Sequence, residues 1–289
     1  MLSKNKKIIL DTDIGGDCDD AVALALLHNL MVAEKCILEL ITLSVNYDGG
    51  CATVRAINRY YGRAKIPIAS SGEKKTCTKR MYATHIKNLY GLSDKPDGEC
   101  VALLRKVLAE STEKITIIGV GPLSNLAKLL VSGGDSVSSQ NGEELIQEKV
   151  EAFYIMGGSA LEMVEFNIAY DIPAAQLFFE KNKVKTFIIP WEMGRGVYTG
   201  ETLIKNDNPA GECVSYWNYY QGKNRDSWDP ITCAIGALDD NIYKKESIKV
   251  HITDNGKTLF TEDSHSNTYL CSNILREQQM KEYLENYLK

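Results

Sequence analysis

Residues 8–30 read IILDTDIGGDCDDAVALALLHNL, and this stretch decides the fold. Its apolar start, residues 8–10, is typical of a short buried strand and ends at Asp11, before a turn rich in Gly and Asp. Residues 21–30 are apolar on nearly every face, which predicts a buried helix. Residues 37–45 (ILELITLSV) predict a second strand. Strand, helix and strand in this order form a βαβ unit, which usually closes right-handed into a parallel sheet.

The alternation of strand and helix continues as far as residue 189. We expect further helices at residues 51–61 and 100–110, another that opens at 121–125, and strands at 66–69, 115–120, 153–156 and 186–189. This pattern predicts an α/β fold in which a single open, mostly parallel sheet is flanked by helices. We therefore assign the whole chain, residues 1–289, to one domain.

The pattern changes after Pro190. Residues 191–230 are rich in aromatic side chains and predict loops. Residues 248–260 predict a hairpin around the turn Asp-Asn-Gly at 254–256. The tail, residues 272–289, has the spacing of an amphipathic helix.

Composition excludes several classes of protein. The 289 residues carry 33 basic and 38 acidic side chains, a net charge of −5 that argues against a broad nucleic-acid or anionic membrane surface. With 44% hydrophobic and 25% charged residues, the chain is typical of a globular protein and not of a disordered one. The eight cysteines form no CxxC pair, and the apolar run after Lys7 is too short for a signal peptide. We therefore expect buried thiols, a cytoplasmic location and no membrane partner.

Five aspartates crowd the junction between the first strand and the first helix: Asp11, Asp13, Asp17, Asp19 and Asp20. Ligands bind at this edge of open parallel sheets. Like charges at this density repel one another unless something positive compensates them, and carboxylate oxygens suit a hard divalent cation. Helix capping with solvated acids is the alternative for any single aspartate. Asp-x-Asp after an apolar strand also resembles the first motif of haloacid-dehalogenase-type Mg²⁺ phosphatases.

Four ordered segments together resemble the nucleoside hydrolases of the inosine-uridine type. They are DTDIGGDCDDA at 11–21, VGPLSN at 120–125, MGG at 156–158 with EFN at 165–167 and Asp171, and SWDP at 227–230. The resemblance implies a Rossmann-like core and a homodimer or homotetramer. It also implies hydrolysis of the N-glycosidic bond of ribonucleosides, with a Ca²⁺ ion in the pocket and a role in purine salvage.

The resemblance also implies a role for each matching residue. The metal would be held by Asp13, Asp20, the Val120 carbonyl and Asp229, and Asp13 would also take a proton from the attacking water. Asp19, Asn46, Glu165, Asn167 and Asp229 would hold the ribose. Local alternatives stay open, because Asp229 before Pro230 is also a helix-cap pattern, and Asn46, Glu165 and Asn167 also suit turns.

Two departures from the family pattern bear on the chemistry. Gly15 and Asp19 are separated by two more residues than in the common signature, so Asp17 competes for a metal or sugar role. Trp228 stands where base-nonspecific members carry a His that protonates the base. Trp228 is either a platform that stacks on a purine, which predicts purine preference, or an aromatic packed on the core. The missing His also leaves open a nucleoside or ribose sensor without turnover.

Overall fold

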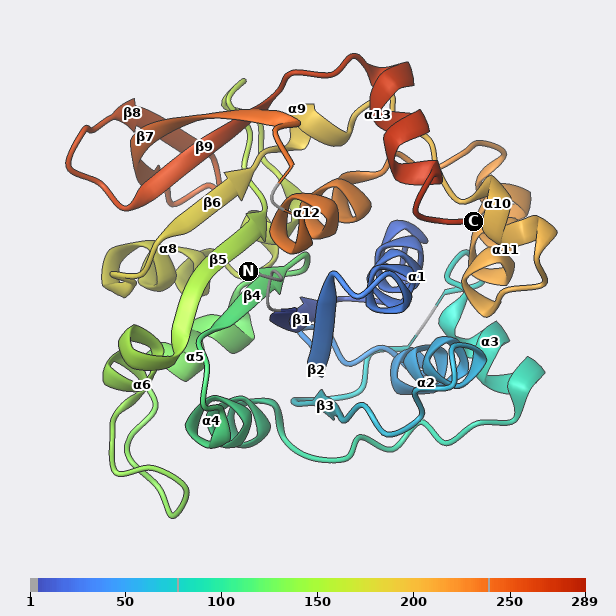
Figure 1. Cartoon of the computed structure of the whole chain (residues 1–289), viewed down its shortest axis with the longest axis horizontal. Coiled ribbons are helices and arrows are strands. Elements are labelled where there is room, and N and C mark those ends of the chain that lie inside the picture. Colours follow the sequence, from blue (N-terminus) through green and yellow to red (C-terminus); the bar gives the residue numbers. More distant parts are fainter. Residues whose placement is uncertain (1–4, 77, 239) are drawn as a thin grey trace.

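In the computed structural model, which describes residues 5–76, 78–238 and 240–289, nine strands form one sheet. Their order across the sheet is β3-β2-β1-β4-β5-β6-β9-β7-β8 (Figure 1). The strands are β1 (Lys6–Thr12), β2 (Cys36–Leu43), β3 (Ile68–Ser70), β4 (Ile115–Gly119), β5 (Val150–Met156), β6 (Thr186–Ile189), β7 (Tyr243–Ile252), β8 (Thr258–Glu262) and β9 (Thr268–Asn273). The predicted open α/β sheet is confirmed.

Most of the sheet is parallel. Strands β3, β2, β1, β4, β5, β6 and β9 pair in parallel with their neighbours, whereas β7 pairs antiparallel with both β9 and β8. The β7–β8 pair is the predicted hairpin, and it forms one edge of the sheet. Because β1 lies between β2 and β4, the chain reverses direction across the sheet beside β1, which opens a crevice at the carboxyl ends of these strands.

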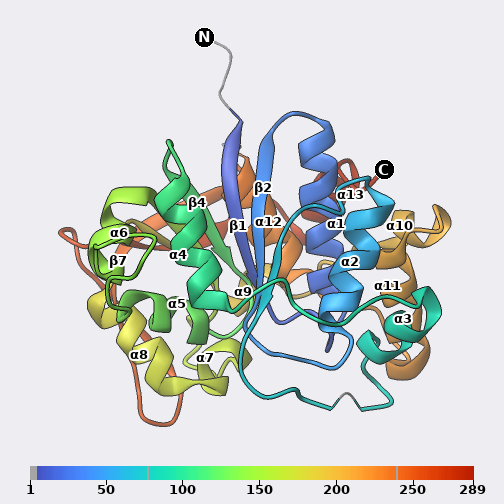
Figure 2. The ribbon, with the colours of Figure 1, turned by 90° about the horizontal axis from the view of Figure 1, so that it is seen from below.

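Helices cover both faces of the sheet, which Figure 2 shows nearly edge-on. On one face lie α4 (Cys100–Glu110), α5 (Ser124–Leu130), α6 (Gly142–Lys149) and α8 (Ile172–Lys181). The other face carries α1 (Asp19–Val32), α2 (Gly50–Tyr60), α3 (Ala83–Tyr90), α10 (Glu201–Lys205), α11 (Pro209–Gln221), α12 (Trp228–Ala237) and α13 (Glu277–Glu285). Two shorter helices, α7 (Phe166–Tyr170) and α9 (Trp191–Gly194), follow β5 and β6.

The alternation of side chains along each strand builds a separate apolar core on each face. Ile8 and Leu10 of β1 belong to the core beneath α1 and α12, whereas Ile9 between them belongs to the core beneath α4 and α5. All three side chains are fully buried. A strand buried on both faces needs apolar residues at every position, which explains the continuous run at residues 8–10.

The predicted bounds of helices and strands agree well with the structure up to residue 190 and less well after it. The helix 100–110 and the strand 186–189 have the predicted bounds. The segment 191–230, predicted to be rich in loops, contains α9, α10, α11 and the start of α12, so it is more helical than predicted. The tail helix is shorter than predicted, because residues 272–273 end β9 and the helix begins only at Glu277.

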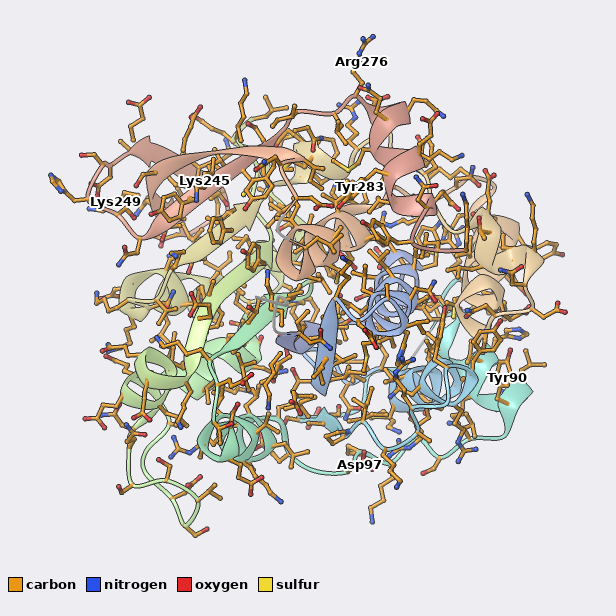
Figure 3. All side chains as sticks on the ribbon, in the orientation of Figure 1. Tyr90, Asp97, Lys245, Lys249, Arg276 and Tyr283 are labelled. Atoms are coloured by element: carbon orange, nitrogen blue, oxygen red, sulfur yellow. The ribbon has the colours of Figure 1, made fainter. Side chains whose placement is uncertain are left out.

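Thiols and charges are distributed as expected for the described residues. The seven cysteines in this part of the chain are all free and buried, and Cys77 lies outside it. Lys249 and Arg276 project outward at the periphery of the molecule (Figure 3). Across the described ranges, no helix combines the length and the apolar character that a bilayer crossing needs.

Candidate active site

The acidic loop between β1 and α1 lies at the crevice beside β1. β1 ends at Thr12, the turn 13–18 follows, and α1 begins with Asp19 and Asp20 in its first turn. Gly15 has φ +138° and donates its N–H to the Tyr82 hydroxyl (3.0 Å), a backbone conformation that favours glycine. The tight turn therefore directs several carboxylates toward one space.

A cavity of about 420 Å³ opens at this point, and we call it the acidic cavity. Seven of the nine residues predicted to contact the metal, the sugar or the base line it: Asp13, Asp19, Val120, Glu165, Asn167, Trp228 and Asp229. Asp17, whose role the sequence left open, lines it as well. These residues come from four separate segments: three of these follow β1, β4 and β5, and the fourth begins α12. Asp20 is buried close to this group but is not part of the lining, and neither is Asn46.

Burial and mutual repulsion dominate the electrostatics of the carboxylates. Burial, followed by the charges of neighbouring aspartates, raises the pKa of Asp13, Asp20 and Asp229 well above the ordinary value. Burial also raises the pKa of Asp19 to about 6 and that of Asp11 to about 7. The protein therefore holds several acids where they are costly to ionise together.

These carboxylates supply the donor set that a hard cation needs, although they do not form a closed cage. Thr12 donates its hydroxyl to Asp20 Oδ1, and among the described residues Asp20 Oδ2 is buried without a hydrogen-bond partner. Within the same part of the chain, no group of three or more His, Cys, Asp or Glu side chains is arranged to hold an ion. Oxygen donors, an unpartnered buried oxygen and repelling charges fit a divalent cation, but binding would require these side chains to move.

Glu165 and Asn167 occupy a defined turn at the start of α7. Glu165 is the N-cap, and its two carboxylate oxygens accept N–H groups from Asn167 (2.8 Å), Ile168 (3.1 Å) and Gly158 (3.1 Å). Asn167 donates its amide to the carbonyl of Val120 (3.0 Å). Both side chains are buried, which excludes the alternative of a solvent-exposed turn at these two residues.

Asp229 does not cap α12. Ser227 occupies the N-cap position, and Asp229 is the second residue of the helix, 5% exposed and facing the acidic cavity. Its carboxylate therefore meets the carboxylates of the β1–α1 loop across the cavity, which their mutual effects on pKa also indicate. The helix-cap alternative for Asp229 is thus excluded.

Trp228 both packs in the core and lines the acidic cavity. It is 7% exposed, its indole N–H donates to the Trp191 carbonyl (2.5 Å), and its ring stacks with that of Trp191 at 6.1 Å between centroids. The Arg225 guanidinium lies over the Trp228 ring, 4.5 Å from its centroid. The two alternatives for Trp228 are thus combined, and an arginine already covers part of the proposed platform.

Arg225 is the main feature of the cavity that the sequence did not reveal. Its Nε donates to Asp19 Oδ1 (3.0 Å), and its Nη2 donates to Asp17 Oδ2. Asp17, whose role was open, is therefore an ion-pair partner in this structure. The five crowded carboxylates were the available signal, since they required a positive charge nearby, but nothing in the sequence indicated which residue supplies it.

Asn46 and two other polar side chains, His85 and Glu192, are not part of the lining of the acidic cavity. Asn46 is half-buried, and its amide donates to the Gly72 carbonyl (3.0 Å). His85 pairs with Glu212 (2.8 Å between Nε2 and Oε1) and is not part of the lining. Glu192 accepts the Ser159 hydroxyl and the N–H of Leu161 (3.3 Å), so it orders the loop at the cavity edge.

A sequence model described as "Inosine-uridine preferring nucleoside hydrolase" matches residues 8–284. The chain belongs to this family. Members of the family are hydrolases of N-glycosyl bonds, and in general they depend on a metal ion. Membership replaces the phosphatase alternative that the Asp-x-Asp motif had left open.

Individual relatives agree with this membership. The pyrimidine-specific ribonucleoside hydrolase RihA of Enterobacter sp. (strain 638) is 30% identical over 190 residues, which cover 60% of this chain and 56% of that protein. The aligned part thus spans just over half the length of that curated relative.

Two solved structures share the fold of this family member. The inosine-uridine preferring nucleoside hydrolase from Bacillus anthracis superposes with a TM-score of 0.72 at 20% identity, covering 98% of this chain and 99% of that one. The purine-preferring ribonucleoside hydrolase from Gardnerella vaginalis gives a TM-score of 0.73 at 16% identity and covers 98% of each chain. The names of these relatives include both purine and pyrimidine specificities.

Proposed function

We propose that this chain hydrolyses the N-glycosidic bond of ribonucleosides in a calcium-dependent reaction that favours purine ribosides. The observation that carries the proposal is the acidic cavity, in which seven predicted residues from separate segments meet. Its volume of about 420 Å³ is within the range of small-molecule sites. Family membership supplies the reaction class.

For the metal, we propose calcium held by Asp13, Asp20, Asp229 and the Val120 carbonyl. All four donors are hard oxygens, and burial together with the charges of neighbouring carboxylates raises the pKa of all three aspartates. When bound, such a cation compensates these charges and makes a nearby water more acidic. The Val120 carbonyl already accepts the Asn167 amide, and a carbonyl oxygen has a second lone pair for a further contact.

The chain's own residues then supply the proton transfer and the sugar contacts. Asp13 accepts a proton from the attacking water as the general base. The sugar hydroxyls are held by Asp19, Glu165, Asn167 and Asp229, with a weaker contact from Asn46. Because cleavage passes through an oxocarbenium-like state, the surrounding carboxylates stabilise the positive charge that develops on the sugar.

The aromatic side of the cavity supports the purine preference. Trp191 and Trp228 both line it, so a purine base has an aromatic wall to pack against. We further propose a homodimer or homotetramer and a cytoplasmic role in purine salvage. Sedimentation velocity of the purified chain measures the assembly state.

The test is release of ribose from inosine, guanosine, adenosine, uridine and cytidine in the presence of Ca²⁺, with Asp13→Asn as the inactive control. Release from the purine ribosides, lost in the variant, supports the proposal. Equal release from uridine contradicts the purine preference but not the activity. Nucleoside binding without any release would instead support a sensor.

A further inference from the structure

We propose that Arg225 contacts the leaving base, selects 6-oxopurine ribosides such as inosine over adenosine, and stabilises the base as it departs with negative charge. This inference rests on the proposed function and names the substrate class of the same cavity. Arg225 lies in the segment before α12, lines the acidic cavity and has no counterpart among the residues that the family signature indicated.

One edge of the Arg225 guanidinium is used to hold it in place. Nε donates to Asp19 and Nη2 donates to Asp17. These two nitrogens form the side edge of the guanidinium group. Asp17 lies in the lengthened segment between Gly15 and Asp19, so this segment provides the second point of attachment. Trp228 lies under the guanidinium, at 4.5 Å, and a cation over an indole ring is an attractive arrangement.

The other edge of the Arg225 guanidinium carries N–H groups that are available to a ligand. Among the described residues, Nη1 and the second hydrogen of Nη2 make no hydrogen bond that meets normal distance limits. Two parallel N–H groups on an arginine match the O6 and N7 acceptors of guanine and, equally, those of hypoxanthine. Adenine presents an N6 amino donor in place of O6, so one of the two contacts becomes a donor facing a donor.

The chemistry of cleavage gives this contact a second consequence. When the bond between C1′ and N9 breaks, its electron pair goes to the base and spreads over the purine ring, including N7 and O6. The sugar takes the hydroxyl of water, and Asp13 takes the proton, so the base leaves as an anion that later accepts a proton from solvent. Arg225 cannot supply that proton because a guanidinium stays protonated, but its charge stabilises the anion.

A control arginine exists in the same chain. Arg195 also lies over a tryptophan, 5.2 Å from the Trp191 centroid, but it lines a neighbouring cavity with Glu192 and Asp226 and is absent from the acidic cavity. A general loss of arginine–indole packing therefore affects Arg195→Gln and Arg225→Gln alike. An effect on the leaving base appears only in Arg225→Gln.

The experiment measures kcat/KM of the calcium-loaded wild type, Arg225→Gln, Arg225→Lys and Arg195→Gln on inosine, adenosine and p-nitrophenyl β-D-riboside. The phenolate of the last substrate leaves readily and has no purine edge. We expect the wild type to favour inosine over adenosine by about 10- to 100-fold, the range of one bidentate arginine contact. Arg225→Gln should lower this ratio to near one and should reduce p-nitrophenyl riboside cleavage by less than about fivefold. Arg225→Lys, which keeps the charge without the fork, should also lose the ratio.

Two results overturn the inference in distinguishable ways. If the wild type cleaves ribosides but Arg225→Gln keeps the inosine-to-adenosine ratio, or loses all three substrates equally, Arg225 has only a structural or sugar-binding role. If the wild type cleaves none of the three ribosides, the proposed function itself fails and the inference falls with it. Thermal unfolding of each variant separates a folding defect from either result.

Discussion

The acidic cavity and the site around Arg105 both bury charge, but only the second balances it. Arg105 of α4 is 2% exposed, and every guanidinium nitrogen donates within the described structure: Nε to Asp135 Oδ2 (2.7 Å), Nη1 to Ser132 Oγ (2.9 Å), and Nη2 to the carbonyls of Ser138 (3.0 Å) and Gln140 (2.8 Å). In the acidic cavity, Asp13 and Asp229 are buried beside other carboxylates, and Asp20 Oδ2 lacks a partner among the described residues.

This difference separates a structural use of buried charge from a functional one. Around Arg105, the donors and acceptors close the loop 132–140 against α4, and no further ligand is needed. In the acidic cavity, Arg225 pairs with Asp17 and Asp19 but leaves the other carboxylates uncompensated. Buried like charges are costly to maintain, so a fold that keeps them is prepared for a ligand that compensates them.

The largest expected effect is on catalysis by Asp13→Asn. Removing the proposed base should lower kcat by about a thousandfold, within the usual range for a general base. Because one of several repelling charges also disappears, the Tm without calcium should not fall. Steady-state kinetics and a thermal melt on the same preparation measure both quantities.

A structural acid provides the control for Asp13. Asp171 caps α8, where it accepts the Ala174 N–H (3.2 Å) and the Ser124 hydroxyl (2.6 Å), and Asp171→Asn should leave kcat within twofold. The division between the two regions would be contradicted if Asp13→Asn lowered kcat by less than about a hundredfold, or if this variant unfolded.

Arg105→Met should show the opposite behaviour. Loss of the buried guanidinium removes its four hydrogen bonds, which we expect to cost about 4 kcal/mol of unfolding free energy at about 1 kcal/mol for each bond. Activity per folded molecule should stay within twofold, since Arg105 does not line the acidic cavity. Chemical denaturation gives the free energy, and an unchanged denaturation midpoint would show that the matched contacts contribute little.

His28 lies between these two extremes, because only one of its ring nitrogens is matched. Nε2 pairs with Asn58 Oδ1 (2.7 Å) and the ring stacks on Tyr61 at 4.7 Å, but within the described structure the buried Nδ1 has no partner. Burial lowers the pKa of His28 to about 4, below its ordinary value of 6.5.

The pH dependence follows from the direction of this shift. The unfolded chain takes up the proton near pH 6.5 and the folded chain only near pH 4, so His28 supports the fold fully above pH 6.5. As the pH falls from 6.5 toward 4, its contribution to the free energy of unfolding decreases by about 1.4 kcal/mol per pH unit. Denaturation of the wild type and His28→Phe at pH 7.5 and 4.5 measures this, and equal acid losses in both proteins would rule it out.

Calcium should stabilise the acidic cavity by a smaller amount. At a concentration 100 times the dissociation constant, a ligand specific for the folded state adds about 2.7 kcal/mol. We expect calcium to raise Tm and a chelator to reverse the change, and Asp20→Asn should remove most of the response. Asp254→Asn, in the β7–β8 turn, should respond as the wild type does; a Tm insensitive to calcium in the wild type would contradict the proposed site.

The smallest effect should come from Asn46→Ala. In this structure the Asn46 amide is already bonded to Gly72, so reaching a sugar would require that bond to break. We expect KM to rise by less than about tenfold, the value of one ordinary hydrogen bond, with kcat unchanged. A hundredfold loss would show instead that Asn46 turns into the cavity when the substrate binds.

Local patterns in the chain were enough to predict the sheet and its flanking helices, whereas most of the residues around the acidic cavity were predicted from the resemblance of four ordered motifs to the family. Residues 8–10 are apolar at every position because their strand is buried on both faces, and that signal does not depend on the rest of the fold. The ordered motifs indicated Asp13, Glu165 and Asp229 through their resemblance to the family, and the geometry of a parallel sheet explains why segments that follow its strands meet at one edge.

Contacts between distant segments were decided only by the tertiary structure. β9 pairs with β6 in parallel although only one of its six residues is buried, so its strand state depends on the neighbour that it meets. The partners Asp19 and Arg225 are 206 residues apart in the sequence. A charge pair at that separation has no local signature, because its energy depends on where the folded backbone places both groups and how far it removes them from water.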